Sequence, residues 1–153
     1  MTGSTPLKQT QRSLPIALLR AREVVMGPIR DMLATSGVNE QKWRLLRVLQ
    51  ENGPMELTSL AADACLLLPS LTRMVVPMES EGFVTRTTPQ KDRRKVVLTI
   101  TESGEALLRA HADQSSAIFQ AIEDQFGTER LEHLLDLLDD LRSLDLRPRD
   151  HQT

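Results

Sequence analysis

The chain has 153 residues, of which 40% are hydrophobic but only 3% aromatic, a composition that favours packed helices over a β-sandwich or barrel. The formal net charge of −2 does not indicate a nucleic-acid partner, so only a local cluster of basic side chains could do so. A single cysteine excludes a disulfide framework and a cysteine-only zinc site, and no apolar run approaches the ~20 residues that a membrane helix needs.

The first third of the chain predicts an arm followed by two helices. Residues 1–12 are polar and lack a hydrophobic stretch of the signal-peptide type, so we expect a disordered arm, a cytoplasmic protein and no membrane partner. A first helix is predicted from Ser13 to Gly37, and because it is apolar on several sides it should be buried on several sides or belong to an oligomer. Asn39 starts a second helix, which ends at the Asn-Gly-Pro sequence 52–54.

The next segment predicts two short helices in helix–turn–helix order. We expect the first over 59–64 with Thr58 as its cap, and the second over 70–81, ended by Gly82. Pro77 conflicts with the second helix because it removes one backbone hydrogen bond. Cys65 lies in an apolar run between the two helices, which predicts a buried and inert thiol.

The remainder of the chain predicts a β-hairpin and two long helices. The strands are expected over 83–87 and 95–100, joined by a polar turn. A single helix is then predicted over 102–126, with Thr101 as its cap and Gly104 as a weak point. A last helix, capped by Thr128, carries a leucine stripe to about residue 144, and a polar tail follows.

Charge is distributed unevenly along the chain. Residues 84–95 hold five basic side chains against one acid, whereas residues 121–153 hold nine acids against four arginines. A basic hairpin directly after a helix–turn–helix is the arrangement of a winged-helix DNA-binding protein, in which one helix enters the major groove and the hairpin reaches phosphate or the minor groove. The alternative is a solvated, charged hairpin on an unrelated helical protein.

Four segments resemble the MarR family of winged-helix regulators in order and spacing over residues 57–104: PSLTR at 69–73, ESEGFVTR at 79–86, DRR at 92–94 and LTITESG at 98–104. Three further segments resemble, more narrowly, the branch of the family that regulates homoprotocatechuate (4-hydroxyphenylacetate) degradation: SLPIALLRARE at 13–23, QKWR at 41–44 and ACLLLPSLT at 64–72.

This resemblance implies a fold that is mainly α with a small β-hairpin wing, in a winged helix-turn-helix, MarR-like homodimer. Residues 13–36 and 102–145 would form the helical dimerisation region, 37–101 the DNA-binding lobe and 146–153 a tail. The dimer would bind a near-palindromic operator in double-stranded DNA, with half-sites about one helical turn apart.

The resemblance also assigns DNA-contacting residues in two segments. Those of the recognition helix are Ser70, Leu71, Thr72 and Arg73, and those of the wing are Arg86, Lys91, Asp92, Arg93, Arg94 and Lys95. In the wing, the carboxylate of Asp92 should steady Arg94, which is directed at the minor groove. For Leu71 a methyl contact to a base and a place in the core both remain open.

A small aromatic acid of the phenylacetate or catechol type is the effector that the resemblance implies, in a pocket lined by the first, second and fifth helices. Such a ligand needs a cation for its carboxylate and an aromatic wall for its ring, which Arg22, Trp43 and Arg44 could supply. Ser13 and His111 could reach a phenolic hydroxyl. Arg22 could instead be a salt-bridged surface residue, and Trp43 a core residue.

No set of residues predicts catalysis. The three histidines are scattered without metal-ligand spacing, and phosphate-binding glycine loops and nucleophile elbows are missing, so we expect no enzyme activity, no cofactor and no metal site, with zinc a remote option. The function predicted is a DNA-binding regulator of the repressor type that acts on an aromatic-acid catabolic operon and is released from its operator by the aromatic effector. Two alternatives remain: a DNA-binding relative that responds to another ligand or to none, and a helical interaction protein without a DNA role.

Overall fold

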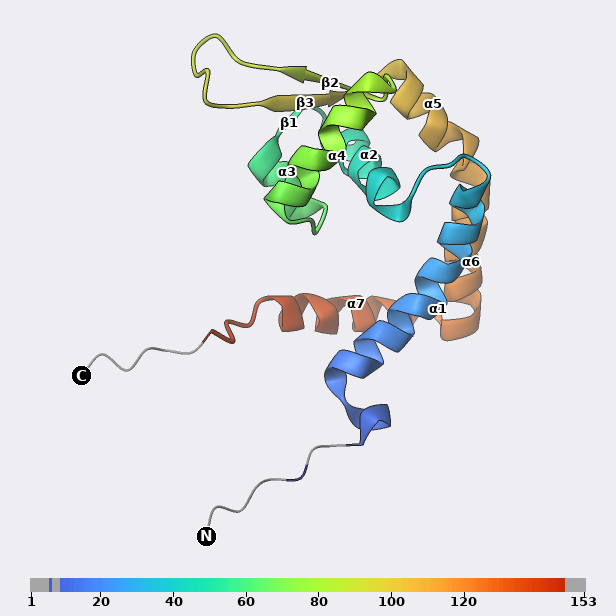
Figure 1. Cartoon of the computed structure of the whole chain (residues 1–153). Coiled ribbons are helices and arrows are strands. Elements are labelled where there is room, and N and C mark those ends of the chain that lie inside the picture. Colours follow the sequence, from blue (N-terminus) through green and yellow to red (C-terminus); the bar gives the residue numbers. More distant parts are fainter. Residues whose placement is uncertain (1–5, 7–8, 148–153) are drawn as a thin grey trace, which may run out of the picture. The chain divides into compact units, whose positions relative to one another are not determined.

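The computed structural model describes residue 6 and residues 9–147, which form two compact units, 1–116 and 117–153 (Figure 1). The elements of the first unit are η1 (Thr10–Arg12), α1 (Leu14–Ala34), α2 (Glu40–Asn52), β1 (Met55–Glu56), α3 (Leu57–Asp63), α4 (Leu68–Ser80), β2 (Val84–Thr87), β3 (Val97–Ile100) and α5 (Glu102–Ala110). Helix α6 (Ala112–Phe126) begins in the first unit and continues into the second, which also contains α7 (Thr128–Arg142).

Helix α1 begins close to its predicted start, after a short 3-10 helix that the sequence did not predict. Thr10–Arg12 is ordered as η1, so the prediction of a disordered arm is wrong there, and residues 1–5 and 7–8 lie outside the described part. Ser13 occupies the N-cap position, but its side chain makes no capping hydrogen bond. The helix continues through Pro28 to Ala34.

Helix α2 forms the centre of the first unit. The side chain of Asn39 accepts a hydrogen bond of 2.8 Å from the backbone N–H of Lys42, which confirms the predicted cap. Leu45, Leu46 and Leu49 are fully buried, and the helix contacts α1, α3, α5 and β3. Burial of these three side chains contributes about 1.5–3 kcal/mol each relative to exposure, so α2 is a fixed element of this unit.

The helix–turn–helix is confirmed, but its helices begin two residues earlier than predicted. Helix α3 starts at Leu57, so Thr58 is not its cap, and α4 starts at Leu68 with a proline in its first turn. Helix α4 runs through Pro77 to Ser80 without interruption. The prediction of a buried thiol is wrong, because Cys65 lies exposed in the turn between the two helices with a left-handed φ of 53°.

Three short strands form an antiparallel sheet in the order β1–β3–β2. In the central strand, the fully buried Leu98 is paired with Met55 of β1 on one side and Arg86 of β2 on the other. Strand β1 was not predicted, because two residues are too short to show an alternating pattern. The loop of residues 88–96, which joins β2 to β3, projects beyond the strands as the predicted wing (Figure 1).

The single long helix predicted after the hairpin is instead two helices, α5 and α6. The chain leaves the helical conformation at His111, whose φ is −106° and ψ is 2°. His111 is buried and its Nε2 lies 2.5 Å from Oγ of Ser36, a contact across 75 residues that no local pattern reveals. The predicted cap is confirmed, because the side chain of Thr101 accepts a hydrogen bond from the N–H of Gly104.

In the second unit, α7 begins at Thr128 but is preceded by Gly127, with a φ of 98°, at the cap position, so Thr128 is not the cap. The helix ends at Arg142, two residues before the predicted end, and none of its residues is buried. Within the described residues no single helix has both the length and the apolarity to cross a membrane; α3 and α4 pass that test only when taken together, and they are bent by 107° at their break.

Gly104 provides a test of the packing between α5 and the sheet. A Cβ atom at this position would lie 2.5 Å from the carbonyl oxygen of Phe83 and 2.7 Å from Cγ1 of Ile100. Because a backbone carbonyl cannot move aside easily, Gly104→Ala should lower the free energy of unfolding by about 2–3 kcal/mol in urea titrations. The matched control is Gly27→Ala in α1, where nothing lies within 4 Å of the added methyl group. Equal stability of the two variants would contradict this packing.

Candidate DNA-binding surface and effector site

The outward face of α4 presents two of the four predicted recognition residues to solvent. Thr72 and Arg73 are exposed and Ser70 is half-buried. The hydroxyl of Thr72 donates a hydrogen bond of 2.9 Å to the carbonyl of Leu68. Leu71 is fully buried, so the structure places it in the core, and its predicted DNA contact is wrong because no part of its side chain reaches solvent.

The tip of the wing carries exposed cations. Lys91, Arg93 and Arg94 are exposed and form no ion pair with another residue in the described part of the chain. Asp92 is half-buried, and its Oδ1 accepts a hydrogen bond of 3.0 Å from the backbone N–H of Arg94. The carboxylate therefore steadies the backbone of the turn at Arg94, whereas the sequence predicted that it steadies the arginine itself.

At the base of the wing, the two remaining predicted cations are paired with carboxylates. Nη2 of Arg86 lies 3.3 Å from Oε1 of Glu79 on α4, and Nζ of Lys95 lies 3.2 Å from Oε1 of Glu56 on β1. A groove of about 310 Å³ lies beside the second pair, between α3, α4 and the wing. Its lining residues are Glu56, Leu57, Thr58, Leu68, Thr72, Arg94, Lys95 and Val96.

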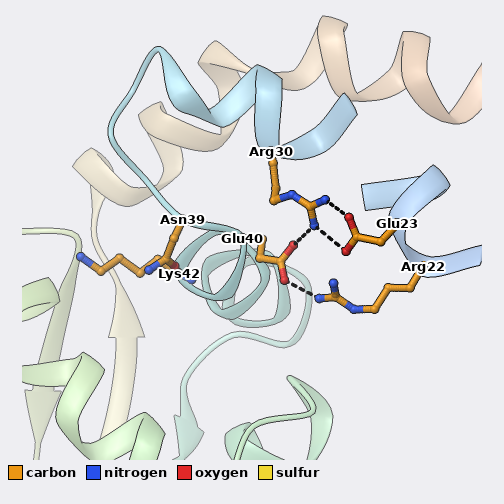
Figure 2. A network of polar contacts seen from close by, with 6 residues as sticks. All are labelled: Arg22, Glu23, Arg30, Asn39, Glu40 and Lys42. Atoms are coloured by element: carbon orange, nitrogen blue, oxygen red, sulfur yellow. Dashed lines mark hydrogen bonds and ion pairs between the residues drawn. The ribbon is translucent and has the colours of Figure 1, made fainter. Parts of the chain in front are cut away.

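A network of ion pairs joins α1 to the start of α2 (Figure 2). Arg22 donates a hydrogen bond to the carboxylate of Glu40, and Nη1 of Arg30 lies 3.5 Å from the other oxygen of that carboxylate. Arg30 also donates to Glu23, whose carboxylate raises the pKa of Arg30. The hydrogen bond from Arg22, followed by the positive charges of Arg22, Arg30 and Arg44, holds the pKa of Glu40 below its ordinary value despite partial burial.

The predicted alternative for Arg22, a salt-bridged surface residue, is thus what the structure shows, with Glu40 as the partner. A further ion pair joins α2 to the end of α4, because Nζ of Lys42 lies 3.8 Å from Oε1 of Glu81.

The structure brings an arginine over the tryptophan, but it is not the one that the sequence suggested. Trp43 is only 8% exposed, and the guanidinium carbon of Arg47 lies 5.3 Å from the centre of its ring. Arg44 is half-buried, and its Nε has no hydrogen-bond partner among the described residues. Sequence reasoning missed Arg47, although residues four apart on a helix lie on the same face and the spacing could have revealed the pair.

The last two predicted effector residues lie on other elements. His111 is 4% exposed and contacts Ser36 through Nε2 and Gln114 through Nδ1, at 2.5 and 3.4 Å. Ser13 lies at the start of α1, and its side chain makes no hydrogen bond to any of the other predicted effector residues. In the described part of the chain, no three His, Cys, Asp or Glu side chains lie close enough to hold a metal ion.

Comparisons with known proteins agree with this architecture. The sequence profile of the MarR family matches residues 38–96. The homoprotocatechuate degradative operon repressor of Escherichia coli is 39% identical over 132 residues, which cover 86% of this chain and 89% of that protein. The transcriptional regulator FarR of Neisseria gonorrhoeae is 36% identical over 140 residues, 92% of this chain and 96% of the relative. The chain belongs to the MarR family.

A solved structure supports the same assignment at the level of the whole chain. The crystal structure of NadR in complex with 4-hydroxyphenylacetate matches with a TM-score of 0.80 and 35% identity, over 92% of this chain and 100% of that one. The predicted fold class and family are confirmed, and this MarR-family chain is a DNA-binding transcriptional regulator rather than an enzyme.

The ion pairs of Glu40 predict a dependence of stability on pH. Glu40→Gln should lower the free energy of unfolding at neutral pH by about 1–2 kcal/mol, between the values usual for exposed and buried pairs. Because the folded-state pKa of Glu40 is depressed, its contribution is present above its ordinary pKa of 4.5 and is lost as pH falls through the lower folded value. The difference in the free energy of unfolding between the wild type and Glu40→Gln, measured by urea titration, should therefore become smaller as the pH falls below 4.5.

The matched control for this prediction is Glu51→Gln at the other end of α2. Glu51 is exposed and forms no ion pair with a described residue, so its replacement should leave the stability within about 0.5 kcal/mol at every pH. If Glu40→Gln lowers the free energy of unfolding by the same amount at every pH, the charge of Glu40 is not what stabilises the contact between α1 and α2.

Proposed function

We propose that this chain is a homodimeric repressor of an operon for the breakdown of an aromatic acid, and that a phenylacetate-type or catechol-type acid releases it from its operator. As a regulator bound to the operator, it acts in the cytoplasm. Residues 13–36 and 102–145 serve dimerisation, and residues 37–101 form the DNA-binding lobe. The names of two relatives support this proposal, one a repressor of a homoprotocatechuate degradative operon and the other crystallised with 4-hydroxyphenylacetate.

The pair formed by Trp43 and Arg47 is the observation that supports an aromatic acid as the effector. An indole ring with a guanidinium 5.3 Å above it brings an aromatic surface and a cation together, which suits a ligand with a ring and a carboxylate. Arg44 is a second cation on the same helix. Arg22, the cation named from the sequence, is paired with the carboxylate of Glu40.

DNA binding is assigned to the exposed part of α4 and to the wing. Arg73 has the donors to reach base edges or phosphates in the major groove, Thr72 can accept a hydrogen bond through its hydroxyl oxygen, and Ser70 lies at the start of the same helix. The cations at the tip of the wing, Lys91, Arg93 and Arg94, are suited to phosphate or the minor groove.

Exposed apolar side chains support the homodimer. In the first unit several of them lie on α1, at Leu14, Leu18, Leu19, Val24 and Val25. In the second unit several lie on α7, at Leu134, Leu135, Leu137 and Leu138. Packing of a second copy of the chain against these helices would remove the side chains from water.

The proposed release follows from the position of α2. This helix carries Trp43 and Arg47, and it also contacts α1, α3, α5 and β3, so a ligand on its surface acts on the element around which the DNA-binding lobe is packed. The dimer would have one arrangement that fits the operator and another that does not. An effector changes operator affinity only if it binds the second arrangement more tightly than the first, a difference that is typically worth about 1–3 kcal/mol.

The wing assignment is tested by removing one cation. Arg94→Ala should weaken operator binding by about 1–3 kcal/mol in a fluorescence-anisotropy titration, because a desolvated contact to phosphate or minor groove is lost. Arg109→Ala is the matched control, since Arg109 is an exposed arginine on α5 that is paired with Glu102. An Arg94 variant with unchanged affinity would remove the wing from the DNA interface.

The effector class is tested with Trp43, the only tryptophan of the chain, as a fluorescent reporter. Added 4-hydroxyphenylacetate should change its emission and release the protein from DNA, whereas 4-hydroxyphenylethanol, which lacks the carboxylate, should do neither. Arg47→Gln should weaken binding of the acid about tenfold to hundredfold, because a charge-assisted contact is lost without disturbing the core. If a panel of phenolic acids leaves operator affinity unchanged, the regulator responds to another ligand or to none.

A further inference from the structure

The base of the wing differs from its tip in that one of its cations, Lys95, is paired with a carboxylate beside a groove. Lys95 lies 3.2 Å from Glu56, and both side chains line the groove together with Arg94, Thr58 and Thr72. Within this groove the charges of Arg94 and Lys95 exceed that of Glu56 by one. A carboxylate among the phosphate-binding groups of a DNA-binding surface lowers the affinity of that surface for DNA.

We infer that Glu56 competes with DNA for Lys95, so that operator binding exchanges the carboxylate of Glu56 for a backbone phosphate in this groove. The inference rests on the proposed binding of DNA by α4 and the wing. It assigns to Glu56 the role of limiting operator affinity, and to Thr58 and Lys95 that of phosphate contacts.

The ion pair has the properties of one that exchanges readily. Its side chains are 49% and 41% exposed, and a single contact between Nζ and one carboxylate oxygen joins them. Exposed pairs of this kind are worth little in water, so breaking one costs little. A lysine ammonium is a hydrated point charge on a flexible stem, and it can turn from a carboxylate to a phosphate without a fixed geometry.

The other lining residues supply donors for a phosphate. Thr58 is exposed, does not cap α3, and its hydroxyl makes no hydrogen bond to another described residue, so it remains available as a donor. The guanidinium of Arg94 is exposed at the same groove. The hydroxyl of Thr72 already donates to the carbonyl of Leu68, so it contributes no free proton unless that bond is broken.

Removing the carboxylate tests this exchange. In Glu56→Gln, Lys95 no longer has to leave a partner and the phosphate no longer meets a nearby negative charge. Operator affinity should therefore rise about twofold to fivefold for each wing, the range of one exposed ion pair. The slope of log affinity against log salt concentration should become steeper by up to about 0.9 for each wing, because the Lys95 phosphate contact is then made without breaking an ion pair in the protein.

The experiment measures binding by anisotropy at several salt concentrations, with the full chain and a duplex that the wild-type protein selects from a random-sequence pool. A double-mutant cycle combines Glu56→Gln with Lys95→Met. The exchange predicts that Lys95→Met costs more affinity in the Glu56→Gln background than in the wild type, because only there is the lysine free before binding. Thr58→Val should weaken binding about twofold to fivefold, while Thr10→Val on η1 should not change it.

Two results would overturn the inference. Weaker binding by Glu56→Gln would show that its pair with Lys95 serves to hold the wing in place. An equal gain in both lysine backgrounds, matched by Glu51→Gln, would show a general effect of net charge. If the wild-type chain selects no duplex from the pool, the proposed function itself fails, and this outcome is distinct from both.

Discussion

The packing of helix α2 is the constraint on which the rest of the first unit depends. One face of this helix places Leu45, Leu46 and Leu49 in the core, fully out of contact with water, where α1, α3, α5 and β3 meet it. Burial of that face determines where the remaining side chains of the helix lie. Trp43 is therefore held in place, with Arg47 one turn later on the same helix, and a site for a planar ligand requires such a fixed ring.

Ion pairs connect α2 to its neighbour α1 and to the DNA-binding elements α4 and β2. Glu40 of α2 is paired with α1, Lys42 of α2 with Glu81 at the end of α4, and Glu79 of α4 with Arg86 of β2. The pairs of Lys42 with Glu81 and of Glu79 with Arg86 are partly exposed, so each contributes less to stability than the pairs of the more buried Glu40. The apolar core thus fixes α2, whereas the ion pairs from α2 to the end of α4 and from α4 to β2 are weak. Such a lobe can change its orientation for the small free energy that one bound ligand provides.

The parts of this architecture that the sequence predicts are those set by local chemistry. Asn39 and Thr101 cap their helices as expected, and the basic turn lies between two paired strands. The errors have non-local causes. The helix break at His111 coincides with a buried contact to Ser36, 75 residues away in sequence, and Leu71 is a core residue although it lies between residues that are exposed or half-buried. Arg47 was missed although Trp43 was placed on a helix, because the i, i+4 spacing that brings the two side chains together was not applied.

Trp43 shows why core and effector roles need not be alternatives. At 8% exposure it contributes to the core, and the same ring is the surface over which a cation lies. A regulator also has to bind its operator with an affinity that the effector can overcome. Coupling between effector and operator binding typically changes operator affinity only about 5-fold to 150-fold. A repressor that binds its operator less tightly is therefore released completely at lower effector concentrations. A carboxylate among the cations of the wing base has this effect without altering α4, so recognition of bases and strength of binding can be adjusted separately.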